Sequence, residues 1–428
     1  LTQTISGTGA TMDFNSITLT NTSPLVINRN ITVNSNWINN GKNVSGTGIV
    51  TLTGTSTIGG NTDTVFPNLT VKGIVTQGRN TTVNGDFALT AGDFKLNNGS
   101  TRSLTISGNY VQTGGTFDFN SGTTGTSNIF IAGNFSNSSV AGSITTSGAG
   151  APNGTITFNG TGTQILMIPT SGAAIWTKYI VNAASTVQLA STLTLSSANV
   201  ATQAIFVGEL TINGTFNFGT YQITKSGGVS GDAKVSLNSG ATLLTANPNG
   251  IDGAVSSTNI DRTFSIGANY VFNGTTSQIT SLGMPSTINN LTITNNSGVT
   301  LTKQTVITND FSIASGAIAN LGVFTHSAGF LSLGGEGTIA GSWGSTSSPA
   351  TNKTNVYFAA TTGIVNYNCT TPIITTQPLA LTICQNTGGS FNVVTSASSP
   401  TYQWQYSGDN INWINIDAAL GANVSNYT

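Results

Sequence analysis

Few side chains in this sequence could perform acid–base or metal chemistry, and they are scattered along the chain. His326 is the one histidine among 428 residues, so a zinc site built on two histidines cannot form. We interpret His326, in the sequence Phe-Thr-His-Ser, as a surface strand residue. The histidine therefore predicts no catalytic or metal centre.

Three aspartates come closest to forming a cluster of carboxylates. Asp86 and Asp93 could stack near each other, with Asp118 on a later repeat. Enzymes built on stacked strands use clustered carboxylates with basic groups to hold Ca²⁺ or to transfer protons. Asp86 and Asp93, however, follow Asn-Gly and Ala-Gly, where aspartate usually caps its own turn. We predict no catalytic residue, no metal site and no cofactor, and hence a protein that is not an enzyme.

Two glycine-rich segments resemble ligand-binding loops only in part. Leu333–Gly337 lacks the Gly-Lys-Ser/Thr ending of a phosphate-binding loop, so we interpret it as a simple loop. Gly59–Asp63 only approximates the Gly-Gly-x-Gly-x-Asp repeat that binds Ca²⁺ in β-rolls. Neither segment predicts a binding site.

Composition excludes several classes of partner. Only 6% of residues are charged, and the net charge is -1, whereas an average globular domain has about 25% charged residues. Such a chain has no basic surface to attract nucleic acid. A hydrophobic content of 37% also argues against disorder, so we expect a chain that buries a core.

The sequence contains no apolar stretch of the roughly 20 residues needed to span a membrane, so we expect no membrane span. It opens on Leu1 without an initiator methionine or a leader. We therefore expect a segment that is processed or excised from something longer.

Short alternating runs of apolar and small polar residues predict the elements that position these side chains. They recur between Gly and Asn residues, and the alternation is typical of strands. A window with helical periodicity is absent, so we predict an all-β fold with almost no helix. The clearest runs are Ile31–Val33, Leu69–Val71, Leu104–Ile106, Leu210–Ile212, Leu291–Ile293 and Phe311–Ile313.

Internal repeats indicate that these strands are stacked in turns. The aromatics Phe87, Tyr110 and Phe135 recur at near-regular spacing, and the run from Phe158 to Ile165 returns from Phe272 to Ile279. Repeats of this length without helices predict a parallel β-helix, with about 15 turns of about 24 residues. We expect Leu, Ile, Val and Phe to stack inward, the three aromatics to form one column, and Gly and Asn to supply corners with positive φ.

The character of the sequence changes near residue 368. Pro378, Cys384, the run Tyr402–Gln405 and Trp413 are typical of short strands in a β-sandwich. An immunoglobulin-like sandwich needs about 100 residues, so we predict an incomplete domain. The predicted organisation is therefore a β-solenoid over 1–367, followed by the start of an immunoglobulin-like domain over 368–428.

Both parts resemble one kind of protein. The stretch from Phe272 through Asn290–Ile293 to Phe311 resembles the β-helical repeats of large cell-surface adhesins of gliding and other Bacteroidetes, and the tail resembles the immunoglobulin-like modules that follow such repeats. The resemblance implies a secreted, extracellular adhesin or filament component, exported by type IX secretion and involved in cell adhesion or gliding motility. It also implies cell-envelope anchoring or secretion proteins as partners, and an external surface or polysaccharide bound through other parts of the parent protein.

The resemblance also concerns two possible covalent modifications. Asp63-Thr64-Val65 is similar to the acid-hydroxyl-aliphatic pattern of Bacteroidetes O-glycosylation, which makes Thr64 a candidate, although a turn explains these residues equally well. Cys369 and Cys384 are the two cysteines. Cys384 could pair with a later cysteine beyond Thr428, with Cys369, or with neither.

Two functional hypotheses follow. The first is a structural stalk or spacer, because the expected outer faces carry Thr, Ser, Asn and Gly without clustered Trp, Tyr or Arg. The second is a carbohydrate-binding or polysaccharide-degrading β-helix, which rests on fold analogy. Converging carboxylates and basic groups would favour an enzyme, and a row of exposed aromatics would favour sugar binding.

Overall fold

A computed structural model shows that the chain forms two compact units. The first comprises Leu1–Thr338 and Ser342–Asn366, and the second comprises Ile339–Gly341 and Tyr367–Thr428. The division lies beside the predicted boundary at residue 367. The structure describes residues 2–9, 11–20, 23–41, 43–96, 99–139, 143–148, 154–168, 177–195, 197–198, 206–226, 233–367, 374–382, 384, 388–395, 400–417 and 423–427.

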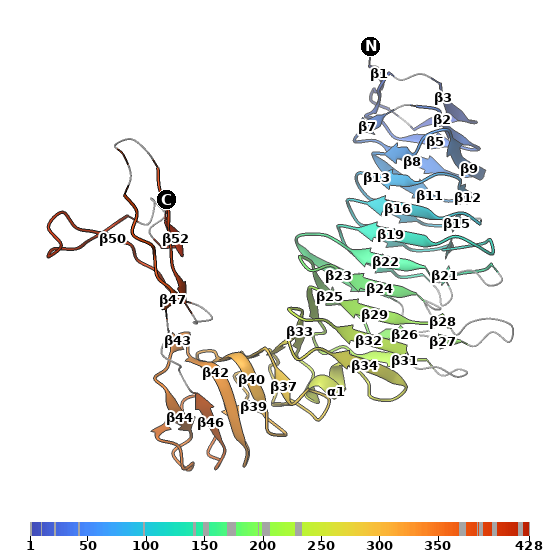
Figure 1. The fold of residues 1–428 in the computed structure, drawn as a ribbon. Helices are drawn as coiled ribbons and strands as arrows, with labels where there is room; N and C mark the ends of the chain where they lie inside the picture. The colour runs from blue at the N-terminus through green and yellow to red at the C-terminus, as the bar shows by residue number, and fades with distance from the viewer. Residues whose placement is uncertain are drawn as a thin grey trace. The chain divides into compact units, whose positions relative to one another are not determined.

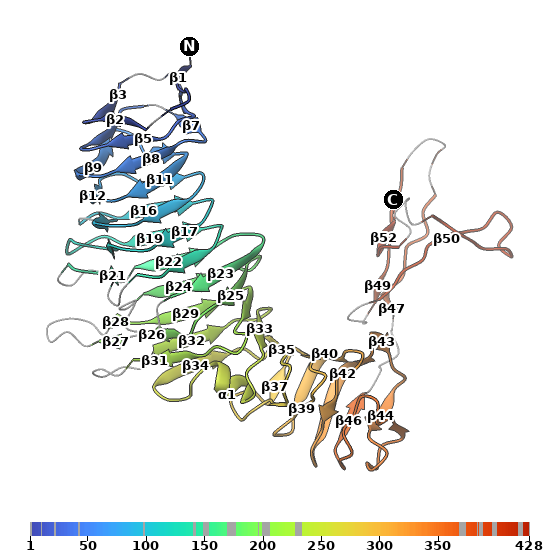
Figure 2. The same cartoon turned by 180° about the vertical axis from the view of Figure 1, so that it is seen from behind.

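The first unit is a parallel β-solenoid of about 13 turns, and 48% of the described residues are in strands and 1% in a helix. This confirms the predicted fold class for the repeat region. Figures 1 and 2 show its strands stacked turn upon turn. Most strands pair in parallel with the strand one turn later, as β5 (Ile31–Val33) does with β8 (Ile49–Leu52), so successive turns are bonded to one another.

One long parallel sheet runs through the unit and links successive turns by strand pairing. It contains β2 (Met12–Phe14), β5 (Ile31–Val33), β8 (Ile49–Leu52), β11 (Asn68–Val71), β14 (Phe87–Leu89), β17 (Tyr110–Gln112), β20 (Phe135–Asn137), β23 (Thr163–Met167), β25 (Thr186–Leu189), β30 (Thr215–Asn217), β33 (Thr242–Thr245), β35 (Asn269–Phe272), β38 (Asn290–Ile293), β40 (Val306–Ile313) and β42 (Thr325–Leu333).

Two further sheets form the other sides of the stack. The nine-stranded sheet contains β10 (Thr64–Phe66), β13 (Thr81–Val83), β16 (Arg102–Ile106), β19 (Ser127–Ile131), β22 (Thr155–Phe158), β24 (Lys178–Val181), β29 (Glu209–Ile212), β32 (Ala233–Leu237) and β34 (Ile260–Phe264). The seven-stranded sheet contains β3 (Ile17–Leu19), β6 (Trp37–Asn39), β9 (Thr55–Gly60), β12 (Ile74–Gln77), β15 (Asp93–Lys95), β18 (Thr116–Asp118) and β21 (Ile144–Thr145).

Smaller groups of strands complete the first unit. They are β1 (Gln3–Ile5), β4 (Leu25–Ile27) and β7 (Val44–Gly46); β26 (Leu193–Leu195) and β31 (Ile223–Lys225); β27 (Ser197–Ala198) and β28 (Phe206–Val207); and β36 (Gln278–Ile279), β39 (Val299–Thr300) and β41 (Ala319–Asn320). The long sheet also includes β37 (Thr287–Ile288), β43 (Glu336–Gly337), β44 (Gly341–Gly344), β45 (Asn352–Lys353) and β46 (Ile364–Tyr367). The described helix is α1 (Gly250–Ala254). In the described part of the chain, helices lack the length and apolar character needed to cross a membrane.

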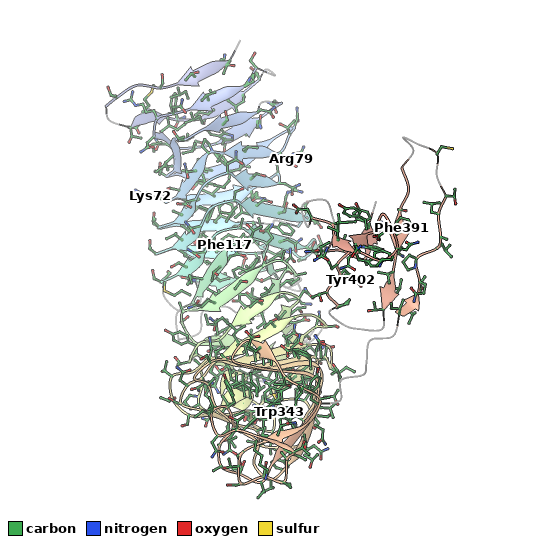
Figure 3. All side chains as sticks on the ribbon, turned by 90° about the vertical axis from the view of Figure 1, so that its left-hand side faces the viewer. Lys72, Arg79, Phe117, Trp343, Phe391 and Tyr402 are labelled. Atoms are coloured by element: carbon green, nitrogen blue, oxygen red, sulfur yellow. The ribbon has the colours of Figure 1, made fainter. Side chains whose placement is uncertain are left out.

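Alternation within each strand builds the core. Leu69 and Val71 are fully buried, while Thr70 between them lies on the outer face. The predicted aromatic column is confirmed: the rings of Phe87 and Tyr110 are stacked at 5.4 Å, and those of Tyr110 and Phe135 at 4.4 Å. Figure 3 shows the side chains on the stack, with Phe117 among its turns. Burial of such aromatics dominates core stability.

Corners are built differently from the prediction. Glycine does supply positive φ, as at Gly46 (φ 116°), where a Cβ would collide with the carbonyl oxygen of Ile27. Asparagine rarely does so: among the described residues, positive φ occurs at Asn259 and Asn410 and otherwise at Ser281 or glycine. The other asparagines serve a different purpose, described below.

The second unit pairs its strands antiparallel, whereas most strands of the solenoid pair in parallel. Its strands are β47 (Ile374–Thr376), β48 (Phe391–Asn392), β49 (Val394–Thr395), β50 (Gln405–Tyr406), β51 (Ile414–Asn415) and β52 (Asn426–Tyr427). Trp404 lies 6.2 Å from Phe391 and 5.9 Å from Tyr427, between ring centroids, and its Nε1 donates to the Val424 carbonyl. The immunoglobulin-like identity of this unit stays a prediction.

Candidate functional site

Of the three aspartates considered for catalysis, Asp93 and Asp118 lie on the paired strands β15 and β18, two positions apart in register, whereas Asp86 lies outside that sheet. Asp86 is exposed at the corner before β14, and Asp93 begins β15 in the seven-stranded sheet. Asp118 is buried, and its Oδ1 accepts hydrogen bonds from the backbone amides of Asn120 and Ser147, each at 3.1 Å. Within the described ranges, three or more His, Cys, Asp or Glu side chains never come close enough to hold a metal ion.

The prediction that His326 lies on the surface is wrong. Its side chain is fully buried, because His326 occupies an inward position of β42. Nδ1 accepts a hydrogen bond from the Thr305 amide at 3.2 Å, so Nε2 carries the proton that it shares with the Leu321 carbonyl at 3.1 Å. Burial lowers the pKa of His326, which keeps the ring neutral. His326 therefore joins two turns of the core.

Thr64 is also fully buried, in an inward position of β10. A glycan cannot reach this hydroxyl in the folded turn, so the structure disfavours O-glycosylation there. Cys384 is exposed, whereas Cys369 lies outside the described residues, so the cysteine pairing stays a prediction. The predicted loop Leu333–Gly337 is a tight hairpin: Gly334 and Gly335 have positive φ in the turn, and the residues on either side of them belong to the antiparallel strands β42 and β43.

The structure instead gathers polar side chains between turns, and the clearest group is a ladder along one corner. The side-chain Oδ1 of Asn68 accepts the Asp86 amide at 2.9 Å, and Asp86 Oδ1 accepts the Asn109 amide at 2.7 Å. The same pattern continues on the next two turns. Asn109 Oδ1 accepts the Asn134 amide at 2.9 Å, and Asn134 Oδ1 accepts the Ile165 amide at 2.8 Å. Asp86 is thus a turn residue, as predicted, and it also bonds one turn to the next.

This ladder shows that turns differ in length. Its four successive bonds span 18, 23, 25 and 31 residues. The observed number, about 13 turns, is slightly below the predicted number of about 15.

Buried glutamine forms a second kind of link between turns. In the repeated run from Phe158 to Ile165, Gln164 is buried, and its Oε1 accepts the Gly160 amide at 2.9 Å. Its Nε2 donates to the carbonyls of Ile131 and Gly133 on the preceding turn, at 2.9 and 2.6 Å. Because buried backbone groups must be paired, this side chain closes its own turn and ties it to the one before.

Four charged residues form a column on the outer face of the nine-stranded sheet. Lys178 lies in register with Glu209, Glu209 with Lys234, and Lys234 with Asp261. The Lys178 Nζ and Glu209 Oε2 atoms are 3.4 Å apart. Opposite charges therefore alternate along the column, in a chain with only 12 basic and 13 acidic residues. Opposite charges on adjacent strands favour the observed register.

An inward charge ends the same sheet. Arg262 of β34 continues the inward column below Val235, and its Nη1 lies 2.6 Å from Asp252 Oδ1 of α1. The Gly283 amide also donates to Asp252, at 3.1 Å. Partial burial alone raises the pKa of Asp252, but the bonds from Arg262 and Gly283 hold it below its usual value. β34 is the last strand of the nine-stranded sheet, and inward charges are one of the features that protect sheet edges from further pairing.

Sequence analysis missed both charged groups, although a signal for the column exists. Lys178 and Glu209 each begin their strand directly before its first buried residue, and Lys234 and Asp261 each follow the buried first residue of theirs. The Asp252–Arg262 pair leaves no such signal, because the short helix that carries Asp252 has no repeat counterpart.

Comparison with known proteins leaves the chain without an assigned family. The chain matches no protein-family model, no curated protein and no solved structure. The site must therefore be interpreted from its own geometry.

Proposed function

We propose that this chain is part of an extracellular surface protein, in which the solenoid acts as a structural stalk or spacer. The observation that carries the proposal is the strand pairing from β2 to β42, which joins successive turns without interruption. Each turn contributes backbone bonds on several sides, so a load applied along the stack is shared by many hydrogen bonds.

Side-chain links support the same role. The asparagine ladder adds one bond per turn between Asn68 and Ile165, and Gln164 adds bonds inside the stack. These contacts connect consecutive turns rather than converging on one point, as side chains in a ligand site do. They are suited to transmitting force.

The outer face supports a spacer that avoids unwanted adhesion. Thr32, Thr51 and Thr70 lie in one register on the outer side of the long sheet, and small hydroxylated side chains offer few anchors for binding. We propose that other parts of the parent protein bind the external surface or polysaccharide. Proteins of secretion or of envelope anchoring complete the proposed partners, on the resemblance to surface adhesins.

The test is removal of whole turns in register. Deleting 69–86 places Phe87 where Leu69 was, and deleting 87–109 places Tyr110 where Phe87 was, as the strand pairing dictates. Attachment of the producing cells should weaken gradually as turns are removed. Deleting 71–87 serves as the matched control, because it joins Thr70 to Ala88 inside the paired strands β11 and β14 with a shift of one residue. That shift turns Leu89 outward and should disrupt folding.

Complete loss of attachment after one in-register deletion, with the protein still folded and exported, would place a binding site in the solenoid and overturn the proposal.

A further inference from the structure

The charged column of the nine-stranded sheet is accessible from outside. Lys234 and Asp261 are exposed, and the side chains of Lys178 and Glu209 are 45% and 27% exposed. The four residues are on consecutive strands, so their backbones are about 4.8 Å apart. They present the order positive, negative, positive, negative.

That order is complementary to itself when it is read in reverse. A second identical column, turned by a two-fold rotation, places a negative charge opposite each positive one. The rotation axis passes between Glu209 and Lys234, so that each faces the other across the axis. Lys178 then faces Asp261 of the second copy. A two-fold contact of this kind is closed and pairs one patch with itself.

The neighbouring side chains allow two such faces to approach. The adjacent outward column contains Ile180, Thr211, Ser236 and Thr263, in register with one another. None has a long or charged side chain. Small neighbours leave the charged side chains, of which those of Lys178, Glu209 and Lys234 are long and flexible, free to reach across to a partner.

We propose that this face is an interaction surface for a second copy of the chain, which docks side by side through the column Lys178, Glu209, Lys234 and Asp261. Charge complementarity selects this partner, because the four charges match their own reversed order. The inference goes beyond the stalk and does not rest on it. Association through this face would bundle solenoids laterally.

A charge-swap experiment on the full chain tests the proposal. Variant one carries Lys178→Glu and Glu209→Lys, and variant two carries Lys234→Glu and Asp261→Lys. In each variant, residues 178 and 209 still carry opposite charges, and so do residues 234 and 261, so these neighbours within the sheet stay complementary. In a two-fold pair of either variant, however, like charges face each other at all four positions. A mixture of the two variants restores opposite charges at every position.

Sedimentation velocity at about 0.1 mM protein and about 0.02 M salt should show wild-type dimers that dissociate at about 0.5 M salt, because salt screens exposed charges. Either variant alone should bind itself at least about tenfold more weakly, and an equimolar mixture should dimerise like the wild type. Thermal unfolding of each variant provides the control for folding.

A neutral variant keeps the test decisive if a charge swap disturbs folding. Lys234→Gln with Asp261→Asn changes two exposed residues without creating like-charge neighbours, and it should weaken the dimer. A wild type that stays monomeric under the low-salt condition would overturn the proposal. So would charge-swap or neutral variants that dimerise as the wild type does, because association would then use another face.

Discussion

Gln278 makes the same three hydrogen bonds as Gln164. Its Oε1 accepts the amide of Gly274 at 2.8 Å, and its Nε2 donates to the carbonyls of Thr245 and Asn247, each at 3.0 Å. In both copies the partners lie 4, 33 and 31 residues before the glutamine. The repeat found in the sequence is therefore a repeat of a buried polar link.

Replacing this glutamine should destabilise its turn. Gln164→Leu keeps a similar volume but removes the bonds to the Gly160 amide and to the carbonyls of Ile131 and Gly133. The Ile131 carbonyl still accepts the Asn159 amide at 3.0 Å, so loss of the partners of the Gly160 amide and the Gly133 carbonyl should cost about 1 to 3 kcal/mol. Hydrogen exchange in residues 131–166 measures the effect, because each turn contacts mainly its neighbours. Gln188→Leu is the matched control: Gln188 is half-buried and faces outward on the next turn, opposite Ile165. It should change stability by less than about 0.5 kcal/mol, and an equal effect of both changes would contradict the role of Gln164.

Three tyrosines of the core should ionise only when the chain unfolds. Burial raises the pKa of Tyr110, Tyr179 and Tyr270 above the usual value. Above about pH 10 the unfolded chain loses these protons while the folded chain keeps them, so stability should fall as pH rises. Phenolate absorbance and circular dichroism should therefore change together at high pH. Replacing all three by Phe should reduce that absorbance step, and ionisation of the three in the folded chain would contradict the prediction.

Acid should loosen the turns around His326. Burial lowers its pKa, so the unfolded chain binds a proton first as pH falls below about 6.5. The neutral ring of His326 stabilises the folded chain fully above that pH. This stabilisation is lost as the pH falls toward the lower pKa of His326 in the folded state. Hydrogen exchange in residues 305–333, corrected for its intrinsic pH dependence, should show weaker protection at about pH 5 than at about pH 7. His326→Gln should remove most of this pH dependence, whereas an unchanged dependence would assign it to other groups.

The Asp252–Arg262 pair should show coupling in a double-mutant cycle. Asp252→Ala leaves the Arg262 guanidinium, whose side chain is 18% exposed, in an inward position without its carboxylate. We expect a loss of about 1 to 3 kcal/mol in urea unfolding. Arg262→Leu in the Asp252→Ala background should recover part of this loss, because an apolar residue suits the column. Additive effects of the two changes would show that the pair contributes nothing of its own.

Much of the fold followed from local alternation in the sequence. The triplet Leu69–Val71 specifies which side chains face inward, and the spacing of Phe87 and Tyr110 indicates that they share a column. Local alternation specifies faces because the side-chain period of a strand is two. Stacking then follows from repetition of the same faces.

The polar links could not be predicted in the same way. Lys178 and Glu209 become neighbours only when the length of their turn is known, and turn lengths vary. His326 was misplaced because histidine is buried or exposed with similar ease, and its burial depends on the amide of Thr305 from another turn. Contacts between turns thus require the register, which the sequence does not state.

Unequal turns have a consequence for how this chain can change. The bonds of the corner ladder span 18, 23, 25 and 31 residues, yet the strands on either side keep their pairing. Residues can therefore be inserted or deleted at a corner without moving the strands, since surface loops tolerate insertions at small entropic cost. The solenoid is in this sense a display scaffold, onto which a foreign peptide can be grafted at a chosen height.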